Sequence, residues 1–393
     1  MSSADGKNML VLTHLYASFI KDQMEIIADS QKRVNVLVRR NPIADIANHI
    51  PINYLKPFSS SAVMDLSDKP PNINVFQTPI FYVPTGAGYK RLSLSHYRAA
   101  EKAVNARKLK FDFIHAHFVL SAGYAGAGLK DKHNVPLVVT AHGHDIYDLP
   151  FRDQEWRQQA EYVLNTADHI ITVSEKNHSF IKKLAVKTPV SVIPNGYRKD
   201  RFYPQDSREC RKKLNLPQDK KIILTVGKLF TVKGHTYLID AMEKIVKHRQ
   251  DVLGIIVGDG ELQEKLKKQI ADRSLEKYVI LAGGKPHQEI PVWINACDVF
   301  VLPSLNEGNP TVMFECLGCG KPFIGTDVGG IPEIITSADY GYVIQSRNVV
   351  QLAEKLSDAV DKSWDKEKIC KYAAEFTWQK IVNQIQDVYK NVN

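Results

Sequence analysis

Short apolar segments alternate with amphipathic segments along most of this chain, and this alternation limits the possible folds more than any other feature of the sequence. Near the N-terminus, Met9–Leu15 is predicted to be a buried strand, Phe19–Ser30 a helix and Val34–Val38 a second strand. A strand–helix–strand opening favours a parallel sheet with helices on both faces. The same alternation predicts further strands at Ile73–Ile80, Phe111–Ala116, Pro136–Thr140, His169–Val173 and Val190–Ile193.

A second series of the same kind begins after a polar, charged connection at Arg201–Lys220. Its predicted strands, which have helices between them, are Lys221–Val226, Val252–Val257, Val279–Ala282 and Val299–Leu302. The 393 residues are enough for two hydrophobic cores. The sequence therefore predicts an α/β protein with two doubly wound domains, at residues 1–200 and 201–373, and an amphipathic C-terminal helix within residues 374–393.

The segment Phe300–Ile335, FVLPSLNEGNPTVMFECLGCGKPFIGTDVGGIPEII, carries the clearest chemical pattern. A helix is predicted to begin near Pro310, and two carboxylates, Glu307 and Glu315, flank its start with seven residues between them. The backbone N–H groups around Asn309–Val312 are the orphan donors of a helix N-terminus, which favour a phosphate. A ligand with phosphate in the middle and hydroxyl groups at both ends, such as a nucleotide sugar, would satisfy both the N–H groups and the carboxylates.

Two further groups of polar residues follow predicted strands. The loop Val226–Gly234 (VGKLFTVKG) places Lys228 and Lys233 on a glycine-flanked turn, which can neutralise a diphosphate. In the N-terminal half, polar residues follow several strands whose ends would meet at one edge of a parallel sheet, where open α/β sheets bind ligands. These residues are His117, His142, His144, Asp145 and Asn195. Surface lysines or structural histidines could each give such a pattern singly, and their clustering favours a binding site.

A long motif begins at Pro303 and reads P-S-x-x-E-G-x-P-x-x-x-x-E-x-x-x-x-G-x-P-x-I-x-T-x-x-G-G-x-P-E-I-I. It resembles the signature of the family-4 glycosyltransferases, which are retaining enzymes of glycosyltransferase group 1 with the GT-B fold. The segments H-A-H-F at residues 115–118 and T-A-H-G-x-D at residues 140–145 also resemble that family. The resemblance implies two Rossmann-like domains that face each other across a cleft. It further implies that the C-terminal domain binds a nucleotide sugar, that the N-terminal domain binds the acceptor, and that the terminal helix crosses back onto the N-terminal domain.

The resemblance also implies roles for individual residues. His117 would lie near the donor sugar and the reacting centre, Glu307 would contact hydroxyl groups of the donor sugar, and Glu315 would contact the ribose. Lys228 and Lys233 would bind the diphosphate; the family usually has Arg at the first position, so Lys228 keeps the charge but loses the bidentate geometry. Further donor-binding residues would be Gly308, Asn309, Pro310, Thr311 and Val312. The acceptor side of the cleft would include His142, Asp145 and Asn195.

By this resemblance, the protein is expected to move a hexosyl group from a nucleotide diphosphate sugar to a hydroxyl of a glycan or glycolipid acceptor, in cell-surface polysaccharide biosynthesis. No cofactor or metal is expected, because lysines and a helix N-terminus supply positive charge and no D-x-D triplet is present. Two alternatives stay open: a nucleotide-sugar 2-epimerase of the same fold, and a non-catalytic carbohydrate-binding protein. An NAD-dependent oxidoreductase is disfavoured, because the first turn, His14–Ser18, contains no glycine.

The net charge of +9 is unevenly distributed, since the segment Gly86–Lys110 contains seven basic residues and a single acid, Glu101. This segment is either a solvated helix face or a surface for anionic lipid headgroups or a polyanionic acceptor. No nucleic-acid-binding motif is present, so nucleic acid is not an expected partner. No apolar run reaches the roughly 18 residues that a membrane-spanning helix needs, and the polar N-terminus does not resemble a secretory signal. The odd number of cysteines favours a reducing compartment. We therefore expect a cytoplasmic protein with at most a peripheral contact to the inner face of the membrane.

Overall fold

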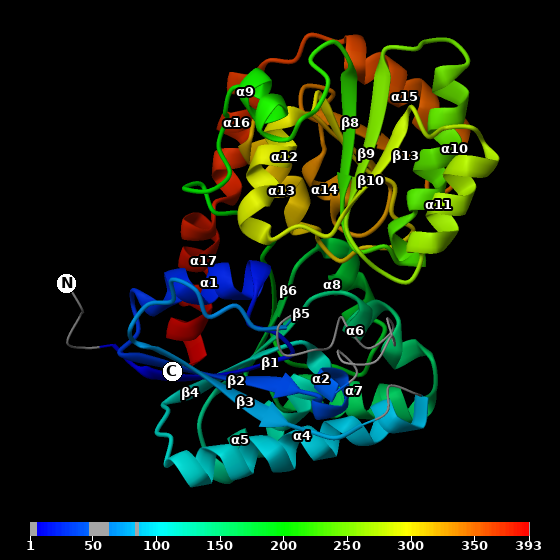
Figure 1. Ribbon diagram of the computed structural model, residues 1–393. Helices are drawn as coiled ribbons and strands as arrows, with labels where there is room; N and C mark the ends of the chain where they lie inside the picture. The colour runs from blue at the N-terminus through cyan, green and yellow to red at the C-terminus, as the bar shows by residue number, and fades with distance from the viewer. Residues whose placement is uncertain (1–5, 47–62, 83–85, 393) are drawn as a thin grey trace. The chain divides into compact units, whose positions relative to one another are not determined.

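The computed structural model describes residues 6–46, 63–82 and 86–392, which form two compact units. Unit 1 comprises Met1–Asn195 and Trp378–Asn393, and unit 2 comprises Gly196–Thr377. Each unit has a parallel sheet with helices on both faces (Figure 1). The divisions fall after Asn195 and Thr377, whereas the domains expected from the sequence divide after residues 200 and 373.

Within the described residues, the sheet of unit 1 has seven parallel strands in the order β3-β2-β1-β4-β5-β6-β7. The strands are β1 (Asn8–Thr13), β2 (Arg33–Arg40), β3 (Ile73–Pro79), β4 (Phe113–His117), β5 (Leu137–Ala141), β6 (His169–Thr172) and β7 (Val190–Val192). The chain adds strands on one side of β1 and then, from β4 onward, on the other. The topological switch point of this sheet therefore lies between β1 and β4.

Helices cover both faces of this sheet, because alternate strand residues point to opposite sides. The helices are α1 (Ser18–Ala28), α2 (Pro42–Ile46), α4 (Gly86–Arg107), η3 (Val119–Gly123), α5 (Tyr124–His133), α6 (His144–Tyr147), η4 (Leu149–Phe151), α7 (Gln154–Thr166), α8 (Glu175–Ile181) and α17 (Trp378–Val392). Leu10 and Leu12 belong to the core beneath α4, α5 and α7. Met9 and Val11 belong to the core beneath α1 and α17. The C-terminal helix α17 thus packs beside α1 and completes unit 1 (Figure 1).

The sheet of unit 2 has six parallel strands among the residues described, in the order β10-β9-β8-β11-β12-β13. They are β8 (Lys221–Val226), β9 (Val252–Val257), β10 (Val279–Gly283), β11 (Val299–Leu302), β12 (Phe323–Thr326) and β13 (Gly341–Ile344). Here the order reverses between β8 and β11. Their carboxyl ends therefore form the switch point of unit 2.

The helices of unit 2 also form two layers (Figure 1). They are α9 (Ser207–Lys213), η5 (Thr231–Lys233), α10 (His235–Val246), α11 (Gln263–Asp272), η6 (His287–Glu289), α12 (Ile290–Ala296), α13 (Thr311–Gly318), α14 (Ile331–Ile334), α15 (Val349–Asp361), α16 (Lys366–Ala373) and η7 (Ala374–Phe376). Phe300 and Leu302 pack toward α12 and α13, whereas Val299 and Val301 pack toward α10 and α15. This alternation gives the unit one hydrophobic core on each face of its sheet.

Two details refine the expectations from the sequence. The C-terminal helix begins at Trp378, because Ala374–Phe376 forms a separate 3-10 turn in unit 2. The five cysteines are free thiols, and Cys316 and Cys319 lie in the core of unit 2. Among the described residues, no helix is long and apolar enough to cross a membrane.

Candidate active site

The residues predicted to bind the donor lie at the switch point of unit 2, between β8 and β11. The loop after β8 carries Lys228 and then Lys233, at the end of η5. The loop after β11 carries Glu307 and leads into α13. Because β8 and β11 are parallel neighbours, both loops leave the same edge of the sheet. Folding therefore brings together Lys233 and Glu307, which are 74 positions apart in the sequence.

Glu307 lies at the centre of this group of side chains. It is only 8% exposed, and its Oε1 accepts hydrogen bonds from Lys233 Nζ and Ser304 Oγ, each at 2.7 Å. The ion pair between Lys233 and Glu307 is partly shielded from water, so solvent screens it less than a surface pair. The sequence motifs singled out Lys233 and Glu307 separately, but nothing in them indicated that the two pair or that Ser304 takes part.

Two glycines of the sequence motifs hold these loops close together. Gly234 has φ +67°, and a Cβ there would lie 1.9 Å from the carbonyl oxygen of Pro303. Gly329 has φ +55°, and a Cβ there would lie 2.2 Å from the carbonyl oxygen of Glu307. A larger residue at either position would push the loop after β11 away from its neighbours. These glycines therefore position Glu307 relative to Lys233.

Glu315 projects from α13 and meets a side chain from another loop. His287, in η6 after β10, has its Nε2 atom 2.8 Å from Glu315 Oε1. Glu315 is buried, whereas His287 is partly exposed. A carboxylate that accepts one hydrogen bond still has lone pairs for the hydroxyl groups of a ligand. Sequence reasoning missed His287, because it lies 28 residues from Glu315 and belongs to no motif.

The other predicted donor-binding residues connect the two carboxylates. The carbonyl of Gly308 accepts a backbone hydrogen bond at 2.7 Å, and Asn309 is buried. Pro310 is the N-cap of α13 and makes no side-chain cap. Thr311 and Val312 begin the first turn, whose N–H groups have no acceptor within the helix. This connection therefore offers backbone donors for an anion beside two carboxylates.

Lys228 makes a more exposed contact at the same edge of the sheet. Its Nζ lies 2.7 Å from Oδ1 of Asp259, which follows β9, and the two side chains are 50% and 60% exposed. Water solvates both groups, so this pair can open with little loss of free energy. Lys228 is thus readily available to a ligand, whereas Lys233 is bound to a buried carboxylate.

The predicted histidines of unit 1 lie at the carboxyl ends of β4 and β5, beside the switch point of its sheet: His117 is the last residue of β4, and His142 directly follows β5. His117 is fully buried; its Nδ1 lies 3.1 Å from His142 Nε2, and the two rings stack. Burial lowers the pKa of His142 to about 3 and the pKa of His117 well below its usual value, so both rings are neutral at physiological pH. Within the described residues, His117 Nε2 has no hydrogen-bond partner. His144 lies apart from this pair, since it is exposed and contacts Asp148.

Asp145 and Asn195 occupy different surroundings from the two stacked histidines. Asp145 is buried, and its carboxylate accepts hydrogen bonds from the N–H groups of Val119 at 2.8 Å, Gly143 at 2.8 Å and His142 at 3.2 Å. It therefore fixes the loops after β4 and β5. Asn195 is buried and follows the edge strand β7, whereas the stacked histidines lie at the carboxyl ends of the adjacent strands β4 and β5.

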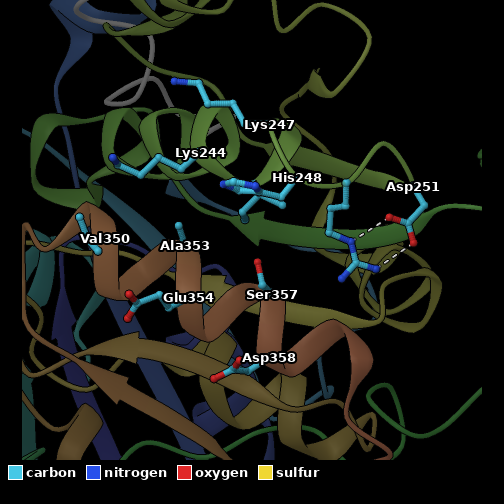
Figure 2. A pocket seen from close by; sticks show the side chains of 11 residues that line it. Lys244, Lys247, His248, Asp251, Val350, Ala353, Glu354, Ser357 and Asp358 are labelled. Carbon is cyan, nitrogen blue, oxygen red and sulfur yellow. Dashed lines mark hydrogen bonds and ion pairs between the residues drawn. The ribbon is translucent and has the colours of Figure 1, made fainter.

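Unit 2 also has a groove between α10 and α15, away from this site (Figure 2). Its volume is about 680 Å³, and its lining includes Lys244, His248 and Glu354. None of the predicted site residues lines it, and its Arg249 is already paired with Asp251. Across residues 6–46, 63–82 and 86–392, no group of three His, Cys, Asp or Glu side chains could hold a metal ion.

Sequence comparison identifies relatives over most of the chain. Residues 206–376 match the family model described as glycosyl transferases group 1, and residues 61–201 match glycosyltransferase family 4. TuaC of Bacillus subtilis, named as a teichuronic acid biosynthesis glycosyltransferase, is 31% identical over 275 residues, or 69% of this chain and 67% of the relative. D-inositol 3-phosphate glycosyltransferase of Corynebacterium jeikeium is 27% identical over 308 residues, or 72% of this chain and 73% of the relative.

Solved structures share the architecture of the whole chain. Sucrose-phosphate synthase from Thermosynechococcus elongatus has a TM-score of 0.79 at 20% identity and covers 98% of both chains. Anabaena HepE in complex with UDP-glucose has a TM-score of 0.73 at 20% identity, covering 98% of this chain and 100% of that one. WaaG, a glycosyltransferase involved in lipopolysaccharide biosynthesis, has a TM-score of 0.72 at 19% identity, covering 97% and 99%. These likenesses confirm the expected GT-B fold. Together with the sequence matches, they show that this chain belongs to the group 1 glycosyltransferases and is a glycosyl-transferring enzyme.

Proposed function

We propose that this enzyme is a retaining glycosyltransferase that moves a hexosyl group from a nucleotide diphosphate sugar to a hydroxyl group of a glycan or lipid-linked acceptor. The observation that carries the proposal is the placement of Lys233, Glu307 and Glu315 around the start of α13. This arrangement combines donors for phosphate with carboxylates for hydroxyl groups. The UDP-glucose complex of HepE supports a nucleotide-sugar donor, and the name of TuaC supports a role in cell-surface polysaccharide biosynthesis.

In the proposed reaction, the bond between the anomeric carbon and the diphosphate oxygen breaks. The acceptor hydroxyl passes its proton to the departing diphosphate oxygen, and the acceptor oxygen bonds to the same carbon on the same face. Lys228, Lys233 and the first-turn N–H groups of α13 stabilise the charge on the leaving diphosphate. As Lys233 turns toward phosphate, oxygens of Glu307 become available to the sugar hydroxyl groups. Glu315, held by His287, binds the ribose hydroxyl groups.

Unit 1 supplies the acceptor side of this proposed reaction. By the family resemblance His117 is assigned to the reacting centre; its imidazole is neutral and buried, and its Nε2 lacks a partner among the described residues. His142 stacks beside it and is partly exposed, so it is the ring of this pair that can contact an acceptor. Because both rings are neutral, neither repels the positive charge that develops on the sugar. Asp145 acts by holding the two loops that carry these rings, and Asn195 follows β7, two strands beyond β5 in the sheet.

Donor binding tests the assignment in unit 2. Calorimetric titration with a panel of nucleotide sugars should identify one that binds, and Glu315→Ala and Lys233→Ala should each weaken it about ten- to a hundredfold. That range follows from the loss of a charged hydrogen-bond partner, about 1.5–3 kcal/mol. Lys244→Ala is the matched control, because it removes an exposed lysine of the same unit outside the site. An unchanged donor Kd in both site variants would contradict the assignment.

Product analysis tests the reaction itself. NMR of the glycoside formed from the donor that binds should show the anomeric configuration of that donor. Inversion would exclude the retaining mechanism. Recovery of an isomerised nucleotide sugar would favour a 2-epimerase, and donor binding without turnover of any acceptor would favour a carbohydrate-binding protein.

We further propose that the enzyme is cytoplasmic and contacts the anionic inner face of the membrane through α4. Arg91, Arg98 and Lys102 are exposed on this helix, with Leu94 between them and Phe81 just before it, 43% and 73% exposed respectively. Their spacing places the cations along one side of the helix. Each cation near an anionic surface contributes about 1 kcal/mol, and salt weakens this attraction.

Co-sedimentation with anionic vesicles at low salt tests this contact. The variant with Arg91, Arg98 and Lys102 changed to Gln should pellet much less than wild type. Lys90 is left intact, because it already pairs with Asp153 and Glu155 at the start of α7. A charge-matched control changes three exposed lysines of α11 to Gln, namely Lys265, Lys267 and Lys268. Equal pelleting of all three proteins would show that the basic segment is only a solvated face.

A further inference from the structure

Arg39 carries a positive charge that no carboxylate neutralises within the described residues. It is partly buried near the end of β2, donates from Nη1 to Ser121 Oγ at 3.1 Å, and lies 5.4 Å from the centre of the Tyr82 ring. The next residue, Arg40, is different, because its guanidinium pairs with Asp45 at 2.5 Å. Among the residues that the structure does not describe, 47–62 and 83–85 contain no Asp or Glu, and Asp5 is the single acidic side chain.

A cation that is partly removed from water and has no counter-charge beside it is unfavourable for folding. Burial lowers the pKa of Arg39, while Tyr82 and Tyr89 raise it, and a guanidinium remains protonated at any physiological pH. The charge is therefore permanent. A strand end that keeps such a charge is better explained by an anionic ligand than by the stability of the fold.

The neighbours of Arg39 add hydrogen-bond donors and no negative charge. Ser121 Oγ accepts a hydrogen bond from Arg39 and lies 2.9 Å from His96 Nδ1, and its hydroxyl proton is free to donate to that nitrogen. The Nε2 atom of His96 is buried and has no partner among the residues described. The N–H of Ser121 donates to His14 Nε2 at 3.2 Å, so His14 carries its proton on Nδ1. Burial, with Arg39 nearby, lowers the pKa of His96 to about 3 and that of His14 well below its usual value, so both rings are neutral and each carries one N–H.

We propose that Arg39 binds an anionic group of the acceptor, a carboxylate or a phosphate, and thereby selects a charged acceptor over a neutral one. This inference rests on the proposed function, because it treats the switch point of unit 1 as the acceptor site. His14 follows β1, Ser121 follows β4, and Arg39 lies near the end of the adjacent strand β2, so the three meet at the carboxyl edge of the sheet. The forked N–H groups of arginine match the two oxygens of a carboxylate or phosphate.

The test compares glucose, glucuronate and glucose 6-phosphate as probes, titrated without nucleotide at constant ionic strength and followed by ligand-observed NMR. At least one of the two anions should bind wild type at least about tenfold more tightly than glucose binds, as expected for one charge-assisted contact. Arg39→Gln should reduce this preference to within twofold, while Arg39→Lys should keep part of it. Arg40→Gln is the matched control, because it removes the adjacent guanidinium, which already has a carboxylate partner.

The two anions distinguish the source of the charge: preference for glucuronate alone indicates a uronate acceptor, and preference for glucose 6-phosphate alone indicates a phosphorylated one. The proposal is overturned if neither anion binds more tightly than glucose, or if Arg39→Gln retains the preference. Donor binding is measured separately and should be the same in Arg39→Gln and wild type. A wild-type protein that prefers anions but binds no nucleotide sugar would contradict the proposed function and leave the Arg39 site standing.

Discussion

The ion pair between Lys233 and Glu307 should stabilise unit 2 more than an exposed ion pair of the same length does. Among the described residues, Lys233→Met leaves the Glu307 carboxylate with the neutral donor Ser304; the Glu307 side chain is buried and the Lys233 side chain is 25% exposed. Breaking a fully buried pair costs about 3–5 kcal/mol, and a charged hydrogen bond contributes about 1.5–3 kcal/mol. Since Lys233 keeps some contact with water, we expect a loss of about 2 kcal/mol. For a unit of this size, the melting temperature of unit 2 should fall by about 4–8 °C.

A double-mutant cycle with Lys233→Met and Glu307→Gln measures the coupling between the two side chains. Scanning calorimetry is the suitable assay, because the two units need not unfold together and the transition that shifts identifies unit 2. The matched control is the cycle for Lys228 and Asp259, whose ion pair has the same 2.7 Å length but much greater exposure. Its coupling should be no more than about 1 kcal/mol.

The two cycles together can refute the reasoning. If the Lys233–Glu307 changes are additive within about 0.5 kcal/mol, the two charges do not stabilise each other. If both pairs show the same coupling, burial does not decide the strength of these ion pairs. Added salt should weaken the exposed pair more than the buried one, and the reverse order would also contradict the argument.

Three further outcomes are expected. Lys228→Arg should retain activity and bind the donor at least as tightly as wild type, because a guanidinium suits phosphate oxygens; a folded but inactive variant would show that Lys228 is not a simple phosphate contact. Activity should survive EDTA, since Lys228, Lys233 and the start of α13 supply the positive charge; loss of activity with rescue by manganese would contradict this. Burial lowers the pKa of His96, His115 and His142 to about 3, so the unfolded chain binds protons below pH 6.5 that the folded chain excludes. Stability should therefore fall between pH 6.5 and 5, by up to about 1.4 kcal/mol per histidine per pH unit, and a melting temperature that stays level would refute this.

The architecture could be predicted from the sequence because strands buried on both faces are continuous apolar runs. The predicted strands at 221–226 and 252–257 coincide with β8 and β9, and the GT-B fold is confirmed by the solved relatives. The chemical groups of the candidate donor site were also visible, because Glu307 and Glu315 lie in one short motif with fixed glycines. Local spacing is enough to recognise such a motif, since all of its members belong to one loop and one helix.

Only the tertiary structure decided which of these groups meet. Glu307 pairs with Lys233 and Glu315 with His287 because of the strand order β10-β9-β8-β11, and distance along the chain does not reveal which loops leave neighbouring strands. The same holds for Arg39 and Arg40, which are adjacent in the segment RVNVLVRR and equivalent by sequence. Side chains of successive residues along β2 point to opposite faces of the sheet, so Arg40 pairs with Asp45 whereas Arg39 donates to Ser121. The sequence by itself determined the fold and the kinds of side chain at the site, and packing determined their partners, because a charge is neutralised by what folding places beside it.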